Sequence, residues 1–158
     1  DKVWALNNID QSVELNSQLR SSLLDIISGD DYFLAYSAIR AIKPVHLDSD
    51  SLQVGLFSKY NQVNHGLKKM IIEKLIEAPY LNSEIVRLSR SLLEQLNGQQ
   101  LGDFLKLYSK HSVNDLETCR IISKILQNEN RYISQKAYKF LMGVKTRDSI
   151  IIENLNGY

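Results

Sequence analysis

The chain has 158 residues, of which 44% are hydrophobic and 23% are charged, the composition of an ordinary globular protein with a sizeable core. With only seven glycines and two prolines, it has little material for the many tight turns of an all-β fold, so we expect long helices. The formal net charge of +1 excludes a global attraction to nucleic acid or membranes, and any such attraction must come from a local patch.

Cysteine content and hydropathy indicate the cellular compartment that we expect for the protein. Cys119 is the only cysteine, which excludes an intrachain disulfide and a cysteine-based zinc cluster and fits a reducing compartment. No apolar run approaches the roughly 18 residues of a membrane span, and no signal peptide is recognisable. We therefore expect a cytoplasmic protein. Because the sequence starts at Asp1 without a methionine, we also expect it to be part of something longer.

Apolar residues first recur at helical spacing between residues 19 and 42. They form two stripes with the spacing i, i+4, i+5, i+8: Leu19, Leu23, Leu24, Ile27 and then Leu34, Ala38, Ile39, Ile42. Each stripe is the face that an amphipathic helix turns toward a core. Asn16 and Asp31 precede the stripes by three residues, where Asn and Asp side chains cap the free N–H groups of a helix. The sequence thus predicts a pair of capped helices.

Both stripes and both caps return every 33 residues. The second helix repeats as Leu67, Ile71, Ile72, Leu75, then Gln100, Phe104, Leu105, Tyr108, then Ile133, Ala137, Tyr138, Leu141. The first helix repeats as Leu52, Leu56, Phe57, Tyr60, then Ile85, Ser89, Arg90, Leu93, then Thr118, Ile122, Ser123, Leu126. In the weaker third copy, Leu88, Leu92 and Leu96 indicate a shifted apolar face. The caps that follow the first pair are Ser49, Asn64, Asn82, Asn97, Asp115 and Asn130.

The ends of the helices and of the array fit the same register. Gly29, Pro44, Pro79 and Gly143 are expected to end helices. Helices joined by such short turns pack antiparallel, and one pair cannot bury its apolar face alone. The sequence therefore predicts an all-α fold, a right-handed α-solenoid of about four antiparallel helix pairs with a 33-residue repeat. We expect one domain over 1–158, with the end of a preceding repeat at 1–9, four repeats at 16–143 and an extra terminal helix at 148–156.

A known repeat family carries a similar pattern. The segment GDDYFLAYSAIRAI resembles the second helix of a HEAT repeat, which follows an Asp-containing turn and has small and aliphatic residues at this spacing. The last such helix, NENRYISQKAYKFLMG, resembles it more loosely. The signatures of tetratricopeptide and ankyrin repeats are absent. The resemblance to HEAT/armadillo-like proteins implies a binding scaffold with an elongated ligand surface.

Residues that could carry catalysis or bind a metal are scattered. His46, His65 and His111 share no ligand spacing, so no metal or other cofactor is expected. Cys119 is expected to be buried, and no histidine is placed by the sequence to act as its base. Arg40 and His46 have the loose Arg…His spacing of helical ribonucleases of the HEPN class, although Pro44 interrupts the helix that would carry them. No glycine-rich phosphate loop occurs.

Basic residues follow the apolar stripes of the second helices. The candidate binding residues are Arg40, Lys43, Lys69, Lys106, Lys110, Lys136 and Lys139. In HEAT-type stacks the second helices line the concave surface, where such side chains would suit phosphates or an acidic peptide. Glu73 and Glu77 in the same band favour the alternative that this is an ordinary solvated helix face.

Three functional hypotheses follow. The leading one is a non-catalytic protein-binding scaffold, not an enzyme, with a protein or peptide partner. The second is nucleic-acid binding through the basic residues, as an accessory or regulatory domain of a larger nucleic-acid enzyme. A minor alternative is a helical ribonuclease-like domain. Neither a membrane nor a small molecule is expected as a partner.

Overall fold

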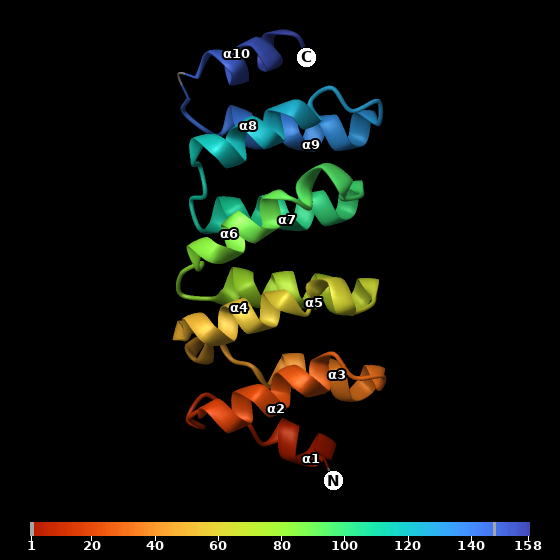
Figure 1. Ribbon diagram of the computed structural model, residues 1–158, viewed down its shortest axis with the longest axis vertical. Helices are drawn as coiled ribbons and strands as arrows, with labels where there is room; N and C mark the ends of the chain where they lie inside the picture. The colour runs from red at the N-terminus through yellow and green to blue at the C-terminus, as the bar shows by residue number, and fades with distance from the viewer. Residues whose placement is uncertain (1, 147) are drawn as a thin grey trace. The chain divides into compact units, whose positions relative to one another are not determined.

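The computed structural model describes residues 2–146 and 148–158, and within them it contains helices and turns but no strand (Figure 1). The expectation of an all-α protein is thereby confirmed. The α-helices are α1 (Lys2–Asn7), α2 (Ser17–Ile27), α3 (Tyr32–Ala41), α4 (Asp50–Ser58), α5 (His65–Glu77), α6 (Ser83–Arg90), α7 (Gly98–Lys110), α8 (Leu116–Ile125), α9 (Arg131–Met142) and α10 (Ser149–Asn156). Short 3₁₀ helices lie at Pro44–Asp48, Tyr60–Gln62 and Leu93–Gln95.

The helices from α2 to α9 begin directly after the residues that the sequence predicts as caps, and α10 begins directly after Asp148. The side-chain oxygen of each cap accepts a hydrogen bond from a backbone N–H group in the first turn, at distances between 2.8 Å for Asn82 and 3.4 Å for Ser49. The others are Asn16, Asp31, Asn64, Asn97, Asp115, Asn130 and Asp148. Because an orphan N–H at a helix start otherwise needs water, each such cap stabilises its helix by about 1 kcal/mol.

Residues 1–85 form the first of two compact units. In it, α3 packs against α1, α2 and α5, while α4 packs against α2 and α5. The predicted apolar stripes supply its core: Leu23, Ile27, Ala38, Ile39, Ile42, Leu52, Leu56, Ile71, Ile72 and Leu75 are all at most 1% exposed. Gly55 permits a close approach, because a Cβ atom there would lie 2.6 Å from the Cδ1 atom of Leu24.

Residues 86–158 form the second unit. Here α9 packs against both α7 and α8, and α10 packs against α8. Its core contains Phe104, Tyr108, Ile122, Ala137 and Leu141, again from the predicted stripes. Two glycines bring α9 close to α7: a Cβ atom at Gly98 would lie 2.5 Å from the ring of Tyr132, and one at Gly102 would lie 3.0 Å from the Nζ atom of Lys136.

For the first helix of the third pair, α6, the sequence indicates a shifted apolar face, and this prediction is wrong. Ile85, Ser89 and Leu93 are buried, whereas Leu88, Leu92 and Leu96 are only half-buried. The register therefore continues through a serine, which is possible because its hydroxyl is fully hydrogen-bonded: it donates to the Val86 carbonyl at 2.9 Å and contacts the Tyr108 hydroxyl at 2.5 Å. A satisfied polar group can occupy a core position that sequence patterning assigns to an apolar residue.

Candidate binding site

Three of the predicted basic residues line one hollow in the second unit. The hollow, which we call the lysine groove, has a volume of about 280 Å³. Its wall consists of Gly102, Leu105, Lys106 and Ser109 of α7 together with Lys136, Lys139 and Phe140 of α9. The sequence places these lysines one or two positions from buried residues of the same helices, so that burying the apolar stripes turns the lysines outward.

The shape of the lysine groove depends on Gly102. Because this residue has no side chain, the Lys136 side chain lies directly against α7. Its Nζ atom also lies 4.5 Å from the centre of the Tyr132 ring, a cation–π contact within one helix. Lys136 is half-buried in the groove, while Lys106 and Lys139 are exposed.

The positive charge of the groove is not neutralised locally. Among the ion pairs of the part of the chain that is described, none involves Lys106, Lys136 or Lys139. Leu105 and Phe140 supply an apolar floor between the three ammonium groups. Three like charges around one hollow repel one another, so an anionic ligand would lower the electrostatic energy of the site.

The structure does not bring all seven predicted binding residues together. Lys110 is exposed in the last turn of α7 and lies outside the set that lines the groove. In the first unit, Lys69 pairs with Glu73 at 3.8 Å. The Arg40 guanidinium lies 5.7 Å from the centre of the Tyr36 ring, and the Lys43 ammonium donates to the Arg40 carbonyl at 3.2 Å.

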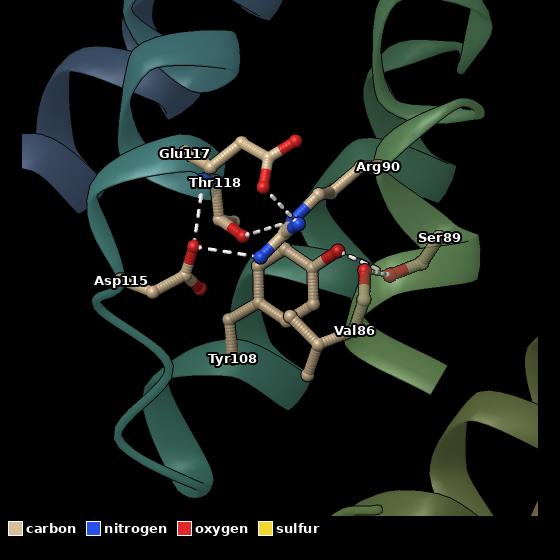
Figure 2. Close-up of polar contacts among 7 residues, drawn as sticks. All are labelled: Val86, Ser89, Arg90, Tyr108, Asp115, Glu117 and Thr118. Atoms are coloured by element: carbon tan, nitrogen blue, oxygen red, sulfur yellow. Dashed lines mark hydrogen bonds and ion pairs between the residues drawn. The ribbon is translucent and has the colours of Figure 1, made fainter. Parts of the chain in front are cut away.

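The densest polar cluster of the second unit joins α6 to α8 (Figure 2). Arg90 donates to Thr118 at 3.0 Å and to Asp115 at 2.9 Å, and it also pairs with Glu117. Burial would raise the pKa of Asp115, but hydrogen bonds from Thr118 and the charge of Arg90 outweigh it and hold that pKa below its usual value. Because the polar groups of this cluster bind one another, the cluster holds α6 against the start of α8.

Beneath Arg90, the Tyr108 ring lies with its hydroxyl against Ser89 (Figure 2). Burial is the main reason that the pKa of Tyr108 is raised to about 12. The phenol is therefore protonated at all physiological pH values and donates its hydrogen bond to Ser89, whose own proton is directed to the Val86 carbonyl. Such a phenol supports the core and offers no acid–base chemistry near neutral pH.

Similar polar contacts connect successive first helices within each unit, and the sequence analysis missed them. Each joins a side chain of one helix to the cap residue of the next: Arg20 to Ser49 at 2.6 Å, Gln53 to the backbone N–H of Asn82 at 3.0 Å, Arg90 to Asp115, and Arg120 to Asp148 at 2.7 Å. In the sequence, the only sign of these contacts is a large polar residue on each first helix. Residues 20 and 53 are 33 positions apart, but residues 90 and 120 do not continue this spacing, so the repeat does not reveal them.

The histidine and cysteine side chains form no reactive group. His46 is largely buried; its Nδ1 atom accepts the Lys43 N–H at 3.0 Å, and its Nε2 atom is buried without a partner. Burial lowers the pKa of His46. Arg40 is exposed on α3, whereas His46 lies buried in the 3₁₀ helix Pro44–Asp48. Cys119 is buried as expected, and burial raises the pKa of its thiol.

Two further properties concern the whole of the described chain. Within residues 2–146 and 148–158, no three His, Cys, Asp or Glu side chains are grouped as ligands of a metal ion. None of the helices there is both long and apolar enough to cross a bilayer.

Comparison with known proteins does not assign the chain. No family model matches the sequence, no curated protein is significantly similar to it, and no solved structure is significantly similar to the fold.

Proposed function

We propose that this chain is a non-catalytic, protein-binding domain of HEAT-like type, and that its lysine groove binds an acidic segment of a partner protein. The proposal includes the right-handed α-solenoid of about four antiparallel helix pairs. It is supported by caps and buried stripe residues that recur in the 33-residue register in both units. Stacked helix pairs offer extended surfaces, which suit peptide segments better than small molecules.

The observation that carries the proposal is the clustering of Lys106, Lys136 and Lys139 around an apolar floor. Carboxylates of an acidic segment would pair with the ammonium groups while its aliphatic carbons cover Leu105 and Phe140. Nucleic acid is the less favoured ligand. Single strands bind largely by stacking bases on aromatic rings, but Phe140, the ring that lines the groove, packs edge-to-face on the buried Tyr108.

Charge reversal in the groove tests the proposal. The probe is a fluorescein-labelled octapeptide of Glu and Asp, and its binding is measured by fluorescence anisotropy at about 0.15 M salt. We expect the double variant K106E/K139E to bind this peptide at least about tenfold more weakly, because two attractive charge pairs become repulsive. The matched control K69E/K110E reverses two predicted lysines outside the groove and should retain the wild-type affinity.

An RNA oligonucleotide of equal charge, in a parallel titration, separates the alternatives. Tighter binding to RNA with a steep salt dependence would replace the peptide by nucleic acid as the ligand. The RNA should also remain intact after incubation with the wild-type chain; cleavage that R40A or H46A removes would support a ribonuclease instead. Equal peptide affinities for both double variants would overturn the role of the groove.

A further inference from the structure

The lysine groove draws its polar groups from two pairs of side chains on helices that pack against each other. Lys106 and Ser109 lie one turn apart on α7, and Lys136 and Lys139 lie one turn apart on α9. Side chains three positions apart lie on the same face of a helix, and α7 and α9 are in direct contact. Lys106 and Lys139 are also 33 positions apart in the chain. The four polar groups thus surround one hollow and do not form a long stripe.

The size of this hollow suits one charged group better than a row of them. Its volume of about 280 Å³ is below the roughly 300–1,000 Å³ of pockets that enclose a whole drug-sized ligand. A bound segment would therefore insert one side chain while its backbone stays outside. Because the axes of packed helices are about 8–10 Å apart and lysine side chains are long and flexible, ammonium groups from both helices can approach the same ligand group.

A single carboxylate would use only part of the positive charge of the groove. It carries one negative charge on two oxygen atoms, whereas a phosphate monoester carries about −1.5 to −2 charges near pH 7 and has three acceptor oxygens. None of the residues that line the groove is acidic, so a dianion would relieve more of the repulsion among the three lysines than a carboxylate does. A backbone phosphate of nucleic acid carries only one charge and has no such advantage.

We propose that the lysine groove binds the phosphate group of a phosphorylated serine in the partner's acidic segment. This inference rests on the proposed function and specifies the partner: an acidic segment becomes a tight ligand when one of its serines is phosphorylated. The three lysines contact the phosphate oxygens, and the Ser109 hydroxyl donates a further hydrogen bond. The carbon atoms beside the phosphate cover Leu105 and Phe140. Phosphorylation of the partner would thus switch its binding on.

The test varies the central residue of a labelled peptide that has two Glu residues on each side. This residue is Ser, Glu or phosphoserine, and binding is measured by fluorescence anisotropy at about 0.15 M salt. Wild-type protein should bind the phosphoserine peptide about tenfold more tightly than the Glu peptide, since one further charge-assisted hydrogen bond is worth about that ratio. A fourth peptide adds one Glu to the end of the Glu peptide and so matches the total charge of the phosphoserine peptide. It should bind about as weakly as the Glu peptide.

Removing any one lysine of the groove should reduce the preference for phosphoserine, because all three act on one group. We expect K106Q, K136Q and K139Q each to lower the tenfold ratio to about threefold or less. The matched control K110Q removes the same charge from an exposed position of α7 outside the groove and should keep the ratio. Lys106 and Lys139 are exposed, so their replacement leaves the core intact. Circular dichroism verifies that each variant is folded.

The possible failures are distinguishable. If the fourth peptide binds as tightly as the phosphoserine peptide, or if fewer than two of the three variants lower the ratio, the phosphate site is wrong. The lysine groove itself then stands as long as K106E/K139E weakens the binding of both peptides. If no peptide binds, or if K106E/K139E has no effect on any of them, the proposed function itself is overturned.

Two competitors distinguish other sources of phosphate. If inorganic phosphate displaces the labelled phosphoserine peptide as effectively as the unlabelled peptide does, the ligand is the free ion. If vesicles that contain a phosphatidylinositol phosphate bind more tightly than the peptide, the ligand is a lipid headgroup. Either result overturns the assignment to a phosphorylated segment.

Discussion

The second helices of the two units carry different chemistry at corresponding positions. On α3, Tyr32 and Tyr36 are in ring contact, and the Arg40 guanidinium lies above Tyr36. Two repeat lengths later, α7 has Gly98 and Gly102 at the tyrosine positions and Lys106 at the arginine position. The space left by the glycines is taken by Tyr132 and Lys136 of α9. Both helices keep their buried apolar stripe. At these exposed positions, however, α3 carries tyrosines and α7 carries glycines and a lysine.

The contacts that link successive first helices differ in the same way. In the first unit the cap residues themselves are uncharged: Arg20 donates to the Ser49 hydroxyl, and Gln53 accepts from the backbone N–H of Asn82. Those of the second unit are ionic, with Arg90 on Asp115 and Arg120 on Asp148. The second unit thus makes these links with ion pairs, whereas the first unit combines neutral hydrogen bonds with one from the Asn82 side chain to the Asp50 carboxylate at 2.6 Å.

The largest expected effect distinguishes an ionic cap from a neutral one. D115A removes both the cap of α8 and a partner of Arg90, so we expect a loss of about 2 kcal/mol in the free energy of opening of α8. S49A removes the cap of α4 and the acceptor of Arg20, and we expect a loss of about 1 kcal/mol there. Native-state hydrogen exchange measures each helix separately. Equal losses would show that the ion pair adds nothing to the cap.

Acidification should destabilise the first unit before the second. Burial lowers the pKa of His46 below 6.5, so its neutral form stabilises the first unit above that pH, and this stability is lost as the pH falls through the folded-state value. The hydrogen bond from Arg120, together with its charge, lowers the pKa of Asp148 below 3.8, and the pKa of Asp115 is lowered by its hydrogen bonds from Thr118 and by Arg90 in spite of burial. The stability from these two carboxylates is therefore lost only as the pH falls below that value.

Hydrogen exchange between pH 7 and 4, corrected for the intrinsic rate, follows this difference. Amides of α3 and α4 should lose protection first, and those of α8 should retain it. H46Q should remove the early loss, whereas H65Q, a change at an exposed histidine of the same unit, should leave it. If α8 opens first, the assignment of the pH dependence to His46 is wrong.

The smallest effect concerns the two glycines at helix contacts. G102A should stabilise the second unit by up to about 1 kcal/mol, because alanine favours the helix and only the flexible Lys136 end must move. G55A should show no such gain and a loss of up to about 1 kcal/mol, because its Cβ atom would lie 2.6 Å from the Cδ1 atom of the half-buried Leu24. Thermal melting of both variants measures the difference. A gain at both positions would show that α2 and α4 are free to adjust.

Sequence patterning predicted the secondary structure well and the site incompletely. The caps from Asn16 to Asn130 and most stripe residues could be found because local hydrogen bonding and helical periodicity act over fewer than ten residues. Ser89 was misjudged, since its partner Tyr108 lies nineteen residues away. Five of the seven predicted basic residues are exposed and two, Lys43 and Lys136, are half-buried; spacing alone could not tell Lys106, which lines the groove, from Lys110, which does not.

The sequence by itself determined that the protein is helical, where its helices begin, and which face of most helices is buried, because these follow from backbone geometry and the hydrophobic effect. Only the tertiary structure decided which charges meet. Gly102 lets Lys136 approach α7, which brings it into one groove with Lys106 and Lys139. Arg90 reaches Asp115 and Glu117 from a different helix. Distances between side chains on different helices depend on how those helices pack, and that packing is not encoded in the periodicity of either one.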